Sequence, residues 1–188
     1  MRRLWNDWKA FASIRAAKRK PPPKAALQLF RAADGTLLLF PTAWIYVLPE
    51  PAILPPPYVH ETVGKMVLDM AENWFDPPKP DGPPEKKFWT AVPKCRSYRS
   101  FHRGHQLIGI EVEQKPGFLE ASLTYMPRKS DGSYGADNGE VVVSCHISQC
   151  GGEGGKKLAH RIGSAVWQIF RLAEVLDPLP SPALEAQK

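Results

Sequence analysis

Cysteine is scarce in this chain, and no apolar segment is long enough to cross a bilayer. The three cysteines are Cys95, Cys145 and Cys150. An odd number cannot be fully paired within one chain, which argues against a secreted disulfide scaffold and favours a reducing compartment. The longest apolar stretch, 36–48, contains Pro41 and falls short of the roughly 20 residues that span a membrane. Asp7 and Lys9 interrupt the only stretch that resembles a secretory signal, so we expect a cytoplasmic protein.

The motifs of metal sites and of common catalytic centres are missing as well. The residues of metal-ligating type that show any grouping are Cys95, His102, His105, Cys145, His146 and Cys150. Their spacing does not give the two close ligand pairs of structural zinc, so we expect no metal and no cofactor. The glycine-rich segment 151–155 lacks the spacing of phosphate-binding loops and is predicted to be a connection that leads into a helix.

A cysteine nucleophile is the remaining catalytic hypothesis. The charges of Lys94 and Arg96 favour a lowered pKa for the Cys95 thiol. Catalysis would also need an oriented base, for which His102 and His105 are the candidates. Because free cysteines near strand ends are more often inert apolar residues, we predict that the chain is not an enzyme.

Positive charge is present but very unevenly distributed. The formal net charge is +6, yet residues 1–24 hold eight basic residues against Asp7, which gives +7 and leaves −1 for the other 164 residues. Leu4, Trp8 and Phe11 recur at helical spacing, so this arm is predicted to form a short amphipathic helix. The body is near neutral, unlike a domain with a basic folded face for nucleic acid.

Proline divides the body into two halves. Most of the 20 prolines cluster in 21–23, 49–57 and 77–84, where they separate the predicted elements. In the first half, 25–41 is predicted to be a β-hairpin that turns at Asp34-Gly35, 42–48 a third strand, and 59–74 a helix. In the second half the predicted strands are 88–92, 106–113, 119–126 and 140–147, and the closing helix carries apolar residues from Leu158 to Leu176.

Both predicted helices carry a glycine in the same place of a similar pattern, Val63-Gly64 and Ile162-Gly163. Because glycine inside a helix costs about 1 kcal/mol relative to alanine, the pair indicates close approach to a sheet or to another helix. The sequence thus predicts an α+β fold, a largely antiparallel sheet packed against two main helices, with a weak repeat of two strand-then-helix halves. The predicted ranges are an arm at 1–24, one domain at 25–176 with halves 25–75 and 85–176 joined by linker 76–84, and a flexible tail at 177–188.

Two groups of residues are candidates for binding. A basic and aromatic run, predicted to alternate as a strand, offers nucleic-acid contacts at Arg96, Tyr98, Arg99 and Arg103. The following segment, 105–153, has a net charge of −4 and suits a basic protein partner. Its candidate contacts are Glu111, Glu113, Glu120, Asp131, Tyr134, Asp137 and Glu140.

The order of KCRSYRSFHRGHQLIGIEVE, LEASLTYMP, a glycine turn and HRIGSAVWQIF resembles the immunity proteins of bacterial contact-dependent growth inhibition systems. Arg96-Ser97-Tyr98 and Phe101 match the core of that pattern, and the likeness covers about residues 88–173. It implies a cytoplasmic, non-catalytic protein that neutralises the C-terminal toxin domain of a delivered effector, commonly a nuclease. The alternative hypothesis is a nucleic-acid-binding accessory protein that uses the basic arm and the run from Arg96 to Arg103.

Overall fold

The body forms one antiparallel β-sheet with helices on both of its faces. The computed structural model describes residues 22–93, 95–135, 143–149 and 154–179. The sheet order is β3-β2-β1-β5-β6-β7, and β4 also pairs with β2. The strands are β1 (Lys24–Ala32), β2 (Leu37–Ala43), β3 (Tyr46–Val47), β4 (Ala52–Leu54), β5 (His105–Lys115), β6 (Phe118–Met126) and β7 (Ser144–Ser148). The predicted α+β fold is therefore confirmed.

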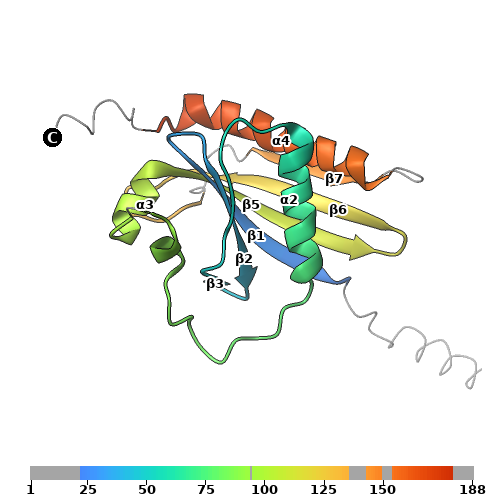
Figure 1. The fold of residues 1–188 in the computed structure, drawn as a ribbon, viewed down its shortest axis with the longest axis horizontal. Coiled ribbons are helices and arrows are strands. Elements are labelled where there is room, and N and C mark those ends of the chain that lie inside the picture. The colour runs from blue at the N-terminus through green and yellow to red at the C-terminus, as the bar shows by residue number, and fades with distance from the viewer. Residues whose placement is uncertain (1–21, 94, 136–142, 150–153, 180–188) are drawn as a thin grey trace, which may run out of the picture.

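Two long helices, α2 (His60–Asn73) and α4 (Gly155–Leu176), cross each other on one face of the sheet (Figure 1). Alternate residues of the central strands point toward them, among them Leu27 and Leu29 of β1 and Ile108 and Ile110 of β5, all buried. This is the period-two pattern of a half-buried strand packed on amphipathic helices. The main core therefore lies between the sheet and the helix pair.

The predicted repeat is visible in the sheet. β1 and β5 form the central antiparallel pair, β2 and β6 flank them, and β4 and β7 pair with those flanking strands. Each half then ends in a helix, α2 or α4. A Cβ atom on Gly64 would lie 1.7 Å from the carbonyl oxygen of Ala159, and one on Gly163 would lie 1.8 Å from that of His60. The two glycines are thus needed where the helices touch.

The opposite face of the sheet is partly covered by the segment that joins the halves. A 3-10 helix, η1 (Phe88–Ala91), and α3 (Tyr98–Gly104) place aromatic rings over Phe30 and Phe40. Phe101 is fully buried with its ring centroid 4.8 Å from that of Phe30. Edge-on aromatic contacts of this kind contribute packing energy beyond area burial. They make a second, smaller core.

Several predicted strands are wrong. Of the predicted strand 88–92, residues Phe88–Ala91 form η1. The run that was predicted to alternate as a strand enters α3 at Tyr98, because Ser97 caps the helix: its hydroxyl accepts from the Ser100 N–H at 3.2 Å. The predicted strand at 42–48 is broken by a turn at Trp44, whose φ is 58°: residues 42 and 43 belong to β2, and only Tyr46–Val47 form β3. β4 lies within the proline cluster 49–57, where no strand was predicted.

The last strand begins at Ser144, and the first part of the predicted range, 140–142, lies outside the described residues, as does the predicted helix of the arm. Lys24, counted with the arm in the sequence, is the first residue of β1. Among the helices of the described part, none has the length and apolar character that a membrane crossing requires.

Candidate functional site

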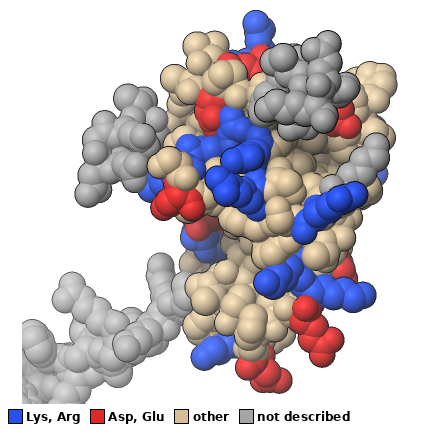
Figure 2. Space-filling model, turned by 90° about the vertical axis from the view of Figure 1, so that its left-hand side faces the viewer, with Lys and Arg blue, Asp and Glu red and all other residues tan. Residues whose placement is uncertain are grey.

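A basic pocket of about 610 Å³ lies at the end of the molecule that carries α3. Its walls come from α3, from the turn that follows β6 (127–135), and from the residue that ends α4. The lining residues are Tyr98, Arg99, His102, Arg103, Arg128, Lys129, Ser130, Asp131, Gly132 and Asp177. Lys and Arg side chains gather on this face (Figure 2). We call this site the α3 pocket.

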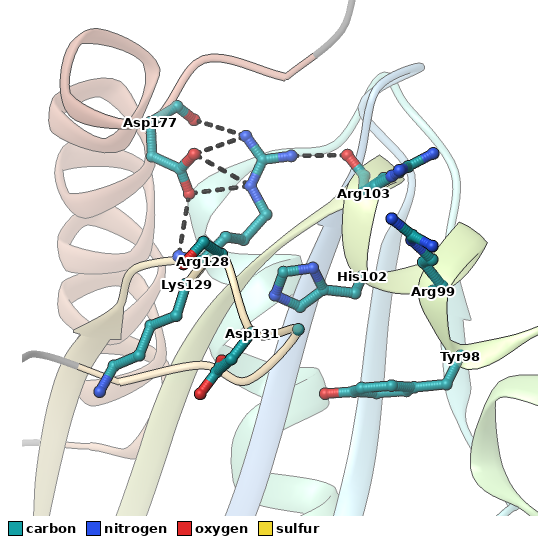
Figure 3. A pocket seen from close by; sticks show the side chains of 10 residues that line it. Tyr98, Arg99, His102, Arg103, Arg128, Lys129, Asp131 and Asp177 are labelled. Atoms are coloured by element: carbon teal, nitrogen blue, oxygen red, sulfur yellow. Dashed lines mark hydrogen bonds and ion pairs between the residues drawn. The ribbon is translucent and has the colours of Figure 1, made fainter.

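Arg99 and Arg103 are the exposed cations of the α3 pocket. They lie one helical turn apart on α3, so their side chains share one side of the helix (Figure 3). Within the described part of the chain, neither guanidinium makes a hydrogen bond or an ion pair. Like charges at this spacing are slightly unfavourable in a helix, and of the two only Arg103, in the last turn of α3, gains from the helix dipole.

Arg128 is held rigidly on the adjoining wall. Its Nε lies 3.0 and 2.9 Å from the two carboxylate oxygens of Asp177, and its Nη1 donates to the carbonyl oxygen of Arg103 at 2.5 Å. Burial alone would raise the pKa of the Asp177 carboxyl, but the hydrogen bonds from Arg128 outweigh it and the pKa is lowered. The ion pair thus ties the ends of α3, β6 and α4 together.

A buried polar network supports Asp177 from behind. The Arg31 guanidinium, 7% exposed, donates to Gln106 Oε1 at 2.6 Å, to the Phe170 carbonyl oxygen at 3.3 Å and to Glu174 at 2.8 Å. Gln106 in turn donates to the main-chain oxygen of Asp177 at 2.7 Å. Because each of these buried groups has a partner, the network fixes the wall without leaving an unsatisfied charge.

The turn 127–135 forms the remaining wall of the α3 pocket. His102 Nε2 lies 2.8 Å from the Ser133 carbonyl oxygen and must donate to it, and the Tyr134 hydroxyl donates to the His105 carbonyl oxygen at 3.1 Å. The Asp131 carboxylate accepts from the Ser133 hydroxyl at 2.7 Å and from its N–H at 2.8 Å, which lowers the pKa of Asp131. These contacts dock the turn on α3.

The acidic residues that the sequence predicted to contact a protein partner lie in two separate places in the structure. Glu111, Glu113 and Glu120 lie together on the sheet face opposite α2 and α4, far along β5 and β6 from α3. Each of them already has a lysine partner. Lys24 lies 2.5 Å from Glu111 and 3.6 Å from Glu113, and Lys115 pairs with Glu113 and Glu120. Their role in toxin binding stays a prediction, weakened by these internal partners.

Most of the other predicted protein contacts and nucleic-acid contacts that the structure describes lie at the α3 pocket. Asp131 lines it and Tyr134 packs beneath it, while Asp137 and Glu140 lie outside the described residues. Of the nucleic-acid candidates, Tyr98, Arg99 and Arg103 line the pocket, and Arg96 is exposed before α3 without lining it. Arg128, Lys129, His102 and Asp177 were missed as binding residues.

The cysteine hypothesis loses its main physical basis. Burial raises the pKa of the Cys95 thiol, so the expectation that Lys94 and Arg96 lower this pKa is wrong. His102 bonds to the Ser133 carbonyl, and His105 Nδ1 lies 2.7 Å from the Phe101 carbonyl oxygen, where it donates. Burial also lowers the pKa of His105, which keeps its ring neutral. In the ranges that the structure describes, no three His, Cys, Asp or Glu side chains are grouped as metal ligands.

No protein-family model matches the chain, and the searches of curated proteins and of solved structures gave no match either.

Proposed function

We propose that this chain is a cytoplasmic, non-catalytic immunity protein that binds the C-terminal toxin domain of a cognate contact-dependent growth inhibition effector. The observation that carries the proposal is that the motif of the family resemblance builds the α3 pocket. Ser97 caps α3, Phe101 anchors it in the second core, and Tyr98 lines the pocket. The resemblance and the concave site therefore fall on the same short segment.

The construction of the pocket also supports a binding role. Its frame is held by the Arg128–Asp177 ion pair and by bonds between the turn 127–135 and α3. A rigid frame that presents exposed charged side chains loses little entropy on association, which favours tight and specific protein binding.

Co-expression with the adjacent gene tests the proposal. The C-terminal domain of the protein encoded immediately upstream should co-purify with this chain and should be non-toxic in cells that produce both. The control is the same toxin domain expressed alone. If the two proteins neither associate nor protect the cell, the immunity function is refuted.

A second candidate function is nucleic-acid binding, which is favoured by the placement of Tyr98, Arg99 and Arg103 in one pocket. Stacking on an aromatic ring beside cations is typical of single-strand recognition. A salt titration with a dT15 oligonucleotide checks it, since several phosphate contacts give a steep log-log slope of affinity against salt. Flat or undetectable binding at moderate salt would reject this function.

A further inference from the structure

The guanidinium groups of Arg99 and Arg103 in the α3 pocket have no counter-charge from the described part of the chain. Arg99 and Arg103 repel each other across one turn of α3, while the nearby carboxylate of Asp177 is already engaged by Arg128. Asp131 accepts two hydrogen bonds from Ser133 within its own turn. Both acidic residues of the pocket therefore serve the frame rather than the exposed arginines.

The chemistry of the exposed pair selects planar oxyanions. A guanidinium presents a fork of N–H donors that matches a carboxylate or a phosphate with two parallel hydrogen bonds. Two forks, one turn apart, fit two neighbouring anionic groups. The pocket volume of about 610 Å³ leaves room for a loop that carries several side chains.

Carboxylates of a protein fit this site better than the phosphates of a strand. A nucleic-acid strand follows a continuous basic groove, whereas these cations converge in one hollow. The sheet surface around Glu111, Glu113 and Glu120 holds three acidic side chains paired with Lys24 and Lys115. It offers no continuation of positive charge along which a strand could run.

We propose that the α3 pocket receives two neighbouring carboxylates from an acidic patch of the toxin domain, one on Arg99 and one on Arg103. This inference rests on the proposed immunity function and reverses the charge expected for the partner surface, since the sequence pointed to acidic contacts on this chain. The partner is thus recognised by its own Asp and Glu side chains. Arg128 and Asp177 position the arginines but do not bind the partner.

Charge reversal in the pocket tests this inference. The variant Arg99→Glu/Arg103→Glu changes only exposed side chains, so it should keep the wild-type melting temperature. Its matched control, Lys86→Glu/Arg171→Glu, makes the same change in net charge at exposed positions outside the pocket. Affinity for the catalytically inactive upstream-encoded toxin domain should fall about 100-fold or more in the pocket variant and less than about threefold in the control.

A charge swap on the toxin domain tests whether carboxylates are the groups that bind Arg99 and Arg103. Single Asp→Arg or Glu→Arg changes over the surface of the toxin domain should include at least one that restores binding to the Arg99→Glu/Arg103→Glu variant. If no swap restores binding, the carboxylate assignment is overturned.

The other outcomes separate the two proposals. If the wild-type chain binds the toxin domain and the pocket variant binds equally well, the α3 pocket is not the site, although the immunity function stands. If the wild-type chain does not bind the toxin domain at all, the immunity function itself fails. If instead it binds dT15 with a steep salt dependence that the pocket variant loses, phosphates are the ligand and the carboxylate inference is overturned.

Discussion

The crossing of α2 and α4 leaves no space for a side chain at Gly64, and the variant Gly64→Ala measures how strict this requirement is. The added Cβ would lie 1.7 Å from the carbonyl oxygen of Ala159 and 2.4 Å from its carbon. Ordinary contacts between carbon and oxygen are about 3.3–3.6 Å, so the helices would have to separate by roughly 1.5–2 Å. Both atoms in conflict with the new carbon belong to a helix backbone, which cannot rotate away as a side chain can.

The expected free-energy change follows from two opposing terms. Overpacking costs about 1–3 kcal/mol or somewhat more, and the better helix propensity of alanine offsets at most about 1 kcal/mol of it. Because the clash at 1.7 Å is with backbone, the cost lies at the upper end, about 3 kcal/mol or somewhat more, and the net loss in the free energy of unfolding should be about 2–3 kcal/mol in urea denaturation. Gly155→Ala is the matched control, because a Cβ there meets no atom within 4 Å. It should leave stability unchanged or raise it by up to about 1 kcal/mol.

The double variant sharpens the test. Gly163 faces His60 at the same crossing, so a separation that accommodates one alanine also relieves the other. The loss in Gly64→Ala/Gly163→Ala should therefore be smaller than the sum of the two single losses. A Gly64→Ala variant within about 0.5 kcal/mol of the wild type would refute the reasoning, since surface substitutions vary by that much.

Three further predictions concern α3 and the frame of its pocket. Phe101→Ala should cost about 3–5 kcal/mol in urea unfolding, because the ring is fully buried, whereas Phe101→Leu should cost under about 1.5 kcal/mol. Asp177→Asn should cost about 1–3 kcal/mol at pH 7. Since the folded-state pKa of Asp177 is lowered, its stabilisation is complete above about pH 4 and is lost as the pH falls, so the difference from wild type should shrink at pH 3. Cys95, whose pKa is raised by burial, should react with iodoacetamide at pH 8 more slowly in the folded chain than in urea, and equal rates would contradict this.

The sequence predicted the elements whose pattern is long and regular. Residues of α2 and α4 repeat at helical spacing over several turns, and β6 alternates strictly, so the main core followed from periodicity alone. The prediction for the segment before β5 was wrong, because α3 has only seven residues and its arginines and serines also fit an alternating strand. Its helical state depends on the Ser97 cap and on the burial of Phe101 against Phe30, a tertiary contact.

The α3 pocket was only partly predictable for a related reason. Tyr98, Arg99 and Arg103 stood out because cations and an aromatic residue are close together in the sequence. Arg128 and Asp177 did not, since they are separated by 49 residues and meet only when β6 and α4 end at the same edge. The sequence assigned Asp177 to a flexible tail, whereas the structure makes its carboxylate the anchor of the pocket frame.

The α3 pocket lies where the repeat of the two halves is broken. β1, β2, β4 and α2 have counterparts in β5, β6, β7 and α4, and together these elements bury the main core. η1 and α3 belong to neither set and form the second core instead. Lys24 and Glu111 of the repeated strands pair with each other, whereas Arg99 and Arg103 of the inserted α3 have no partner in the described chain. Two guanidinium groups that line one hollow are suited to an anionic ligand, which is why the partner is sought at α3 rather than on the open sheet.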